Sequence, residues 1–128
     1  MTIGEYFDTV KERLLTDSLV SLFQLTRERV TLTDGHLRAR LTLSNDSLLE
    51  FSEYVQITTD GRIRVATYSY HWRDNHHALI RRWDNTPHFP ALPNAPHHMH
   101  VGPGEEVREG QPMDIFKVLD ELAQSMSV

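Results

Sequence analysis

The sequence predicts a single α+β domain, in which an antiparallel sheet is covered on one face by two helices. Helical periodicity is confined to the two ends of the 128-residue chain. Between them lie short segments with the alternating pattern of strands. Few residues separate these segments, which favours a meander in which each strand pairs with the next. We therefore expect an N-terminal helix, a five-stranded antiparallel meander, a long His/Pro-rich loop and a C-terminal helix, in one domain spanning residues 1–128.

The first element is a helix with a clear start. Thr2 and Glu5 have the spacing of a capping box. Apolar residues then recur at helical spacing, at Ile3, Phe7, Val10 and Leu14. One side of this helix should pack on the sheet.

Five strand-like segments follow, with turn residues between them. Asp34-Gly35, Asn45-Asp46 and Asp60-Gly61 are typical turn dipeptides, and RDNHH supplies the last connection. The stretch HLRARLTL alternates apolar with polar residues, which predicts one apolar sheet face and one polar face. The expected strands are 19–32, 36–43, 47–58, 62–72 and 78–84.

Residues 85–111 have a different composition and should form a long loop. All six prolines of the chain lie between Pro87 and Pro112. Long loops in compact domains are usually functional or disordered, and this one keeps aromatic, histidine and methionine residues. Beyond it, Pro112 suits the first turn of a helix. The apolar stripe of that helix would be Ile115, Leu119, Leu122 and Met126.

Composition limits the classes of function. There is no cysteine, which excludes disulfides and thiolate metal sites. No apolar run approaches the ~18–20 residues of a membrane span, and the first residues are unlike a signal peptide, so we expect a cytoplasmic protein without membrane contacts. The net charge of −5 argues against avid nonspecific binding of nucleic acid. Residues 27–82, however, carry nine arginines against seven acids, so a local basic site remains open.

Seven of the eight histidines lie between residues 71 and 100, beside Arg81, Arg82 and Asp84. Cleavage of RNA without a metal needs a base for the 2′-hydroxyl, an acid for the leaving oxygen and a cation for the developing charge. Residues of these types could meet at one edge of the sheet. The alternative is a set of exposed, solvated histidines. The candidate catalytic residues are Tyr70, His71, Arg81, Asp84, His88, His97, His98 and His100.

Within this set, His71 or His97 would be the general base and another loop histidine the general acid. Arg81 would stabilise the charge on phosphorus, Asp84 would orient a histidine, and Tyr70 would contact phosphate or base. A metal site is the rival interpretation, with His98 and His100 on one side of an extended segment and Asp84 or Glu53 completing the shell. No recognised metal-binding motif supports that rival.

Arginine pairs two residues apart predict a basic sheet face. These pairs are Arg38/Arg40 and Arg62/Arg64, and the candidate substrate-binding residues are Arg38, Arg40, Arg62, Arg64, Trp72 and Arg82. The simpler interpretation is a solvated face neutralised by Glu28 and Glu50. We expect Tyr68 and Trp83 to pack in the core, whereas Tyr70 and Trp72 could either pack in the core or stack on bases.

Glu53 falls on the apolar face of its segment, where a carboxylate is costly unless it is paired. An arginine partner and an active-site role are both open.

Together these motifs resemble the TumE family of toxins from toxin–antitoxin modules. The resemblance runs from about residue 48 to 125 and rests on Tyr68-x-Tyr70-His71-Trp72, on Arg81-Arg82-x-Asp84-Asn85-x-Pro87-His88, and on Pro96-His97-His98-x-His100. One departure is Phe89, where the family pattern has a second histidine. The resemblance implies a toxin encoded beside a helix-turn-helix antitoxin that binds and silences it.

These observations lead to one expected function and two alternatives. We expect a metal-independent endoribonuclease that needs no cofactor, because there is no GxxxxGK[ST] or GxGxxG motif to hold a nucleotide. The alternatives are a non-catalytic toxin that binds RNA or a protein, and a metal-dependent hydrolase. A homodimer through a sheet edge is left open.

Overall fold

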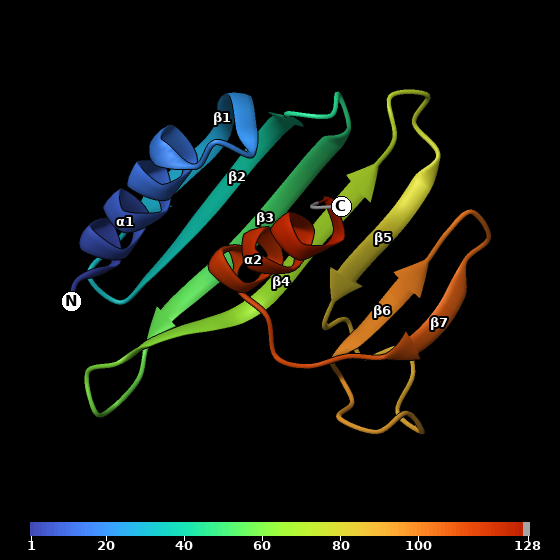
Figure 1. Ribbon diagram of the computed structural model, residues 1–128. Coiled ribbons are helices and arrows are strands. Elements are labelled where there is room, and N and C mark those ends of the chain that lie inside the picture. Colours follow the sequence, from blue (N-terminus) through green and yellow to red (C-terminus); the bar gives the residue numbers. More distant parts are fainter. Residues whose placement is uncertain (127–128) are drawn as a thin grey trace.

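The computed structural model describes residues 1–126. It contains one sheet of seven strands, with a helix near each end of the chain (Figure 1). The elements in chain order are α1 (Ile3–Thr16), β1 (Val20–Val30), β2 (Asp34–Leu43), β3 (Leu48–Ile57), β4 (Ile63–Arg73), β5 (Leu79–Asp84), β6 (His98–Val101), β7 (Glu106–Glu109) and α2 (Ile115–Met126).

The sheet is a continuous antiparallel meander in the order β1-β2-β3-β4-β5-β6-β7. The predicted α+β class, the two helices and the first five strands are confirmed, but the prediction of only five strands is wrong. Within residues 85–111, β6 and β7 form a further hairpin that pairs with β5. Each has four residues, too few for an alternating pattern to be recognised. Hydrogen bonding to the edge of β5, rather than intrinsic propensity, explains why these residues are extended.

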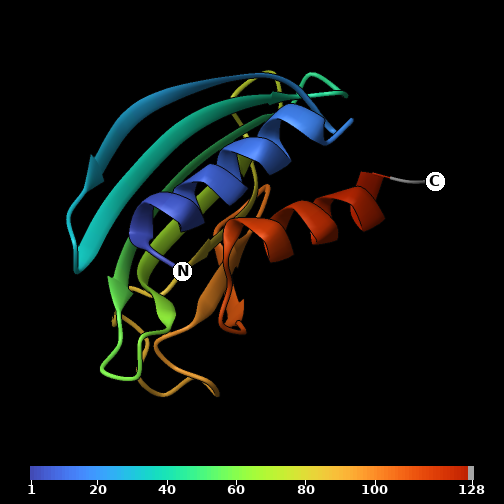
Figure 2. The same cartoon turned by 90° about the vertical axis from the view of Figure 1, so that its left-hand side faces the viewer.

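The sheet is strongly bent, and both helices lie on its concave side (Figure 2). The capping box of α1 is confirmed, because the Thr2 side chain accepts from the Glu5 backbone and the Glu5 side chain accepts from the Thr2 backbone. The predicted apolar stripe is buried, together with Tyr6. Burying this stripe supplies most of the stabilisation of such a helix.

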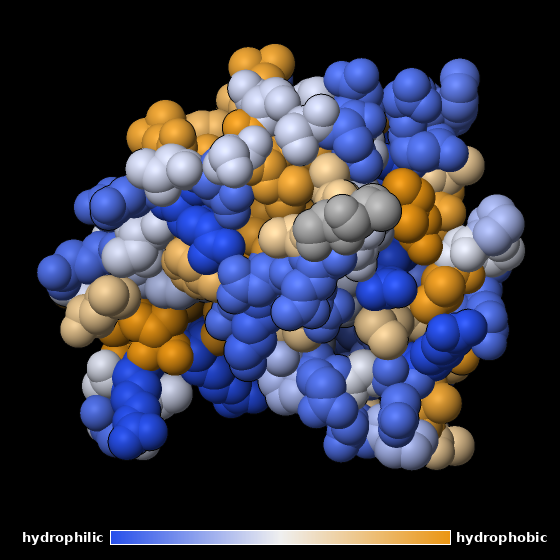
Figure 3. All heavy atoms as spheres, viewed as in Figure 1, coloured by the Kyte–Doolittle hydropathy of each residue, from blue (hydrophilic) through white to orange (hydrophobic). Residues whose placement is uncertain are grey.

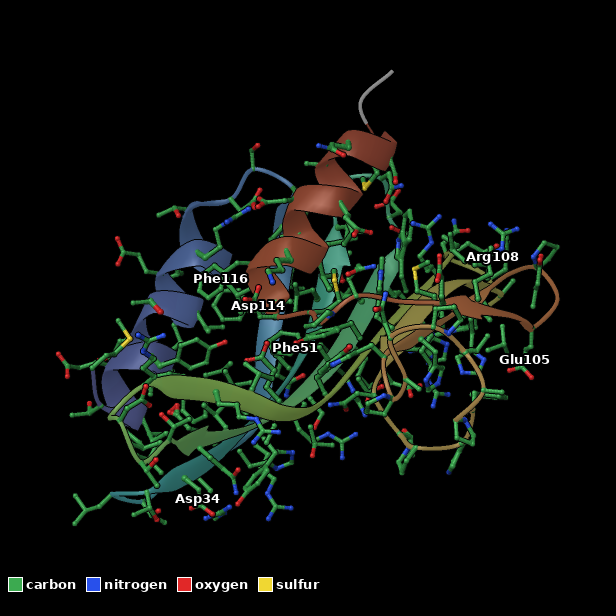
Figure 4. The ribbon with its side chains drawn as sticks, turned by 90° about the horizontal axis from the view of Figure 1, so that it is seen from below. Asp34, Phe51, Glu105, Arg108, Asp114 and Phe116 are labelled. Atoms are coloured by element: carbon green, nitrogen blue, oxygen red, sulfur yellow. The ribbon has the colours of Figure 1, made fainter. Side chains whose placement is uncertain are left out.

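The C-terminal helix starts later than Pro112. Helix α2 begins at Ile115, and the Asp114 carboxylate accepts a hydrogen bond from the Lys117 backbone at 2.8 Å, which caps the first turn. The first turn was therefore predicted wrongly, because a local capping residue determines where the helix begins. The apolar stripe is confirmed, since Ile115 and Leu119 are fully buried. Figure 4 shows Asp114 at the start of α2, above Phe51 of the sheet.

The first hairpin turn is displaced from Asp34-Gly35. The turn lies at residues 31–34, where the Thr31 backbone donates to the Asp34 carbonyl at 2.8 Å. Gly35 already pairs with Val30 inside the sheet. A Cβ at Gly35 would lie 2.6 Å from the side chain of Ile3, so this glycine allows α1 to approach the sheet closely. At Asp60-Gly61 the predicted turn is confirmed, with Gly61 at φ +79°.

Glu53 is buried at the junction of the sheet and both helices, and its partner is not an arginine. Its carboxylate accepts hydrogen bonds from the hydroxyls of Tyr6 and Tyr70, both at 2.7 Å, and from the Ile115 backbone at 2.8 Å. Burial raises the pKa of Glu53 above its ordinary value, and these three hydrogen bonds oppose the rise. This network ties α1, β4 and α2 together beneath the helices.

The two sides of the sheet differ in character. Seen from the helix side, hydrophilic residues dominate the surface over α2, and apolar patches lie near the N-terminus (Figure 3). On the convex side, residues 85–97 curve over β5 and β6 (Figure 4). Within residues 1–126, no helix is long and apolar enough to cross a membrane.

Candidate active site

The register of the sheet aligns polar side chains on its convex face. Residues directly opposite one another on neighbouring strands share a face. One row crosses β1 to β6 and consists of Gln24, Arg40, Glu50, His71, Arg82 and His100. The next row crosses β2 to β6 and consists of Arg38, Ser52, Ser69, Asp84 and His98. The intervening residues, such as Ala39 and Trp83, are buried on the helix side.

Asp84 lies where the two rows reach the histidines of β6, and it contacts residues of both rows. It is 1% exposed although it lies on the convex face. One carboxylate oxygen accepts from His98 Nε2 at 2.8 Å and from the backbone and hydroxyl of Thr86 at 3.1 and 3.0 Å. The other accepts from Arg82 Nε at 2.9 Å and lies 3.7 Å from His100 Nε2. These N–H and O–H groups supply partners to both carboxylate oxygens, which offsets the cost of burying them.

His98 is held between two acceptors. Its Nδ1 lies 2.8 Å from the Pro96 carbonyl oxygen, and its Nε2 lies 2.8 Å from the Asp84 carboxylate. These two contacts, one at each ring nitrogen, fix the orientation of the ring. Phe89 packs edge-on against the ring, with centroids 4.9 Å apart, and shields it from water. The 2%-exposed ring is thus fixed in position and is not free to reach a substrate.

His71 and His100 lie on the two sides of Arg82, each opposite it in the register. They are therefore about 10 Å apart along the row, at about 4.8 Å per strand. Burial lowers the pKa of His71, and the charges of Arg73 and Arg82 lower it further. Burial also lowers the pKa of His100, but the Asp84 carboxylate opposes this shift. Two proton-transfer groups thus flank one cation.

Asp84, His98 and His100 could also hold a metal ion. Their ligand atoms all lie within 4.8 Å of one another. An ion there would have to replace the contact between His98 and Asp84, and it would lie close to the guanidinium of Arg82, which is bound to the same carboxylate. Glu53, the other ligand suggested by the sequence, lies on the opposite face of the sheet.

Comparison with known families identifies the chain. A family model described as toxin TumE matches residues 10–126. The chain belongs to the TumE toxin family. No curated protein and no solved structure matches the chain.

As a TumE toxin, the chain is expected to have an antitoxin partner, and the family motifs contribute residues to both faces of the sheet. Tyr70 donates to Glu53 in the core, and Trp72 Nε1 donates to the Ser47 hydroxyl at 2.9 Å. Arg81 lies on the helix side, with its guanidinium carbon 5.7 Å from the centre of the Trp83 ring. The structure thus separates these three motif residues from the row of histidines.

Two further predicted histidines lie at the border of the candidate site. His97 packs on the helix-side residue Tyr68, and its Nδ1 lies 2.7 Å from the tyrosine hydroxyl. Burial lowers the pKa of His97, and the neighbouring charge of His98 adds to this. His88 is on the loop, with its ring 6.4 Å from that of Phe89. Neither lies in the row that contains Arg82.

The predicted arginine pairs occupy different ends of the convex face. Arg38 and Arg40 lie near Glu50, at 3.8 and 3.5 Å. Arg64 is opposite Gln56 near the start of β4, and Arg62 is in the preceding turn, 3.2 Å from Asp60. The two pairs therefore do not form one patch.

Sequence reasoning missed two residues of this candidate site, Arg73 and Phe89. Arg73 lies 3.7 Å from Glu50, two residues beyond His71 in β4. Alternation would have placed it on the same face as His71 had the strand been extended by one residue. Phe89 gave no signal beyond its departure from the family pattern.

Proposed function

We propose that this toxin is a metal-independent endoribonuclease in which His71 and His100 transfer protons on either side of Arg82. The observation that carries the proposal is their alignment across three neighbouring strands. Arg82 takes the role that the sequence suggested for Arg81. Its Nε binds Asp84 and its side chain is 40% exposed, which leaves the terminal N–H groups for a phosphate.

The different surroundings of the two histidines favour distinct roles. Arg73 and Arg82 disfavour the charged form of His71, which suits a base that starts neutral. Burial lowers the pKa of His100 as well, but the Asp84 carboxylate opposes this shift, which makes His100 the better candidate of the two for the acid. His98 and Asp84 would act as positioning residues that hold His100 and Arg82.

The reaction would proceed by attack of a ribose hydroxyl on the adjacent phosphate. His71 accepts the proton of the 2′-hydroxyl while its oxygen bonds to phosphorus. The P–O5′ bond breaks, and His100 gives a proton to the leaving 5′ oxygen. The products are a 2′,3′-cyclic phosphate and a 5′-hydroxyl, and Arg82 stabilises the negative charge that builds up on the phosphoryl oxygens.

The test is cleavage of a mixed-sequence RNA by the purified protein in excess EDTA, with analysis of the new ends. We expect cyclic-phosphate ends, and a loss of rate of at least about 10²-fold in His71→Ala and in His100→Ala. His76→Ala is the matched control, because His76 lies at the exposed β4–β5 turn. Intact RNA with the wild-type protein, or full activity of both variants, would contradict the proposal. Growth arrest without cleavage would point to a non-catalytic binding toxin.

A metal-dependent hydrolase is the second candidate, favoured by the grouping of Asp84, His98 and His100. It predicts that EDTA abolishes cleavage and that Mn²⁺ or Zn²⁺ restores it. It also predicts 5′-phosphate ends, because a metal-bound water would attack in place of the ribose hydroxyl. The same assay therefore separates the two mechanisms.

The proposed partner is a helix-turn-helix antitoxin encoded beside the toxin gene. Its support is the family membership, which implies an antitoxin in general. Co-expression with the neighbouring gene should restore growth, and the two proteins should purify together. Failure of both would contradict this assignment.

A further inference from the structure

A groove on the convex face begins beside the proposed catalytic row. It has a volume of about 450 Å³ and is open to solvent. Its apolar lining includes Leu22 and Leu48, which lie on either side of Thr42 in the register of β1, β2 and β3. Its polar lining consists of Gln24, Arg40, Thr42, Glu50 and Arg73. Such a volume lies within the range of sites that bind small organic ligands.

The groove is continuous with the proposed site of cleavage. A smaller hollow of about 150 Å³ adjoins it and is lined by His71 and Ser69. Both hollows share Glu50 and Arg73. In the register, Glu50 is opposite His71, so the groove is one strand away from the proposed base. A nucleotide next to the scissile linkage would lie here.

Glu50 is surrounded by cations but keeps capacity to accept hydrogen bonds. Its oxygens lie 3.8, 3.5 and 3.7 Å from nitrogens of Arg38, Arg40 and Arg73. These distances are longer than those of good hydrogen bonds, so the contacts are mainly electrostatic. The side chain is 32% exposed, which leaves the carboxylate accessible from the groove.

We propose that this groove is a nucleobase subsite that selects guanine beside the cleaved linkage. Guanine carries two adjacent N–H donor groups on its Watson–Crick edge, N1–H and N2–H₂, which a carboxylate can accept together. Its O6 and N7 acceptors suit an arginine, and Arg40 and Arg73 both line the groove. The apolar side chains would pack against the face of the base. This inference rests on the proposed ribonuclease function for its biological meaning, but base binding can be measured separately.

The test is binding of the four nucleoside 5′-monophosphates to the purified protein, followed by calorimetry and NMR chemical-shift mapping. We expect GMP to bind at least about tenfold more tightly than AMP, CMP or UMP, with shifts at Thr42 and Leu48. Glu50→Gln should abolish the preference, because the amide offers only one acceptor oxygen. Glu12→Gln, on the exposed side of α1, is the matched control. Thr42→Trp should block the groove and weaken binding of GMP, and tryptophan is compatible with a strand.

Equal binding of the four nucleotides, a preference for another base, or shifts confined to other surfaces would overturn the subsite. The RNA assay in the same preparation distinguishes its failure from that of the proposed function. Cleavage without any base preference would refute the subsite alone. Selective binding of GMP in the groove without cleavage would support the subsite and refute the nuclease.

Discussion

Replacement of Asp84 by asparagine tests the proposed catalytic arrangement at its centre. The carboxylate is 1% exposed and binds both His98 and Arg82. Removal of one partner from a buried ion pair typically costs about 3–5 kcal/mol. The contribution of Arg82 should be small, because its side chain is 40% exposed to solvent. Such a loss is a large share of the about 5–15 kcal/mol of stability of a typical domain, so the folded fraction of the variant must be measured beside its activity.

The effect on activity should differ from a simple loss of stability. The negative charge of Asp84 raises the pKa of His100 against the effect of burial. Without that charge the pKa of His100 falls, so the acid loses its proton at lower pH. We therefore expect a loss of rate of at least about 10²-fold near neutrality, and a descending limb of the pH–rate profile displaced towards lower pH.

Urea denaturation gives the stability, and RNA cleavage between pH 5 and 9 gives the profile. Asp8→Asn, on the exposed side of α1, is the matched control. A destabilised variant with an undisplaced pH profile would make Asp84 purely structural. A variant that cleaves RNA at the wild-type rate would refute the reasoning altogether.

Four other substitutions test three further parts of the structure. Arg82→Ala should lower the rate of RNA cleavage at least about 10²-fold, whereas Arg81→Ala should mainly lower the temperature of thermal unfolding. Equal effects of the two substitutions in both assays would contradict the placement of Arg82 on the convex face and Arg81 on the helix side. The raised folded-state pKa of Glu53 means that the folded protein binds this proton more tightly than the unfolded chain. The stabilisation from this bound proton is therefore lost as the pH rises through the folded-state pKa of Glu53. Glu53→Gln should remove this decrease from a plot of the free energy of unfolding against pH, measured by urea denaturation. Phe89→Ala should expose the His100 ring and raise its pKa in an NMR titration, because burial is the main cause of the lowered pKa. An unchanged pKa of His100 would argue against shielding by Phe89.

Most of the fold could be predicted because its signals are local. The capping box at Thr2 and the apolar stripes of both helices act within a few residues of the chain. Strands β2 to β4 are ten or eleven residues long, so their alternation is unambiguous. By contrast, β6 and β7 consist of four residues each and become strands only through pairing with β5.

The composition of the candidate site was partly predictable, but its geometry was not. Histidines near an Arg-Arg-x-Asp motif suggested proton transfer. Because consecutive residues of a strand point to opposite faces, Arg81 and Arg82 belong to different environments although they are adjacent. No local pattern indicates whether Arg81 or Arg82 lies beside the histidines of β6, because the β6–β7 hairpin was not predicted.

The sequence by itself determined the fold class, the two helices, the alternating strands and membership in the TumE family, since each depends on residues near one another along the chain. Only the tertiary structure decided that Arg82 lies between His71 and His100, that Tyr70 is buried against Glu53, and that Phe89 packs on His98. These contacts depend on strand register and on the path of residues 85–97. Both result from the pairing of backbone groups far apart in sequence, which leaves no periodic trace in the chain.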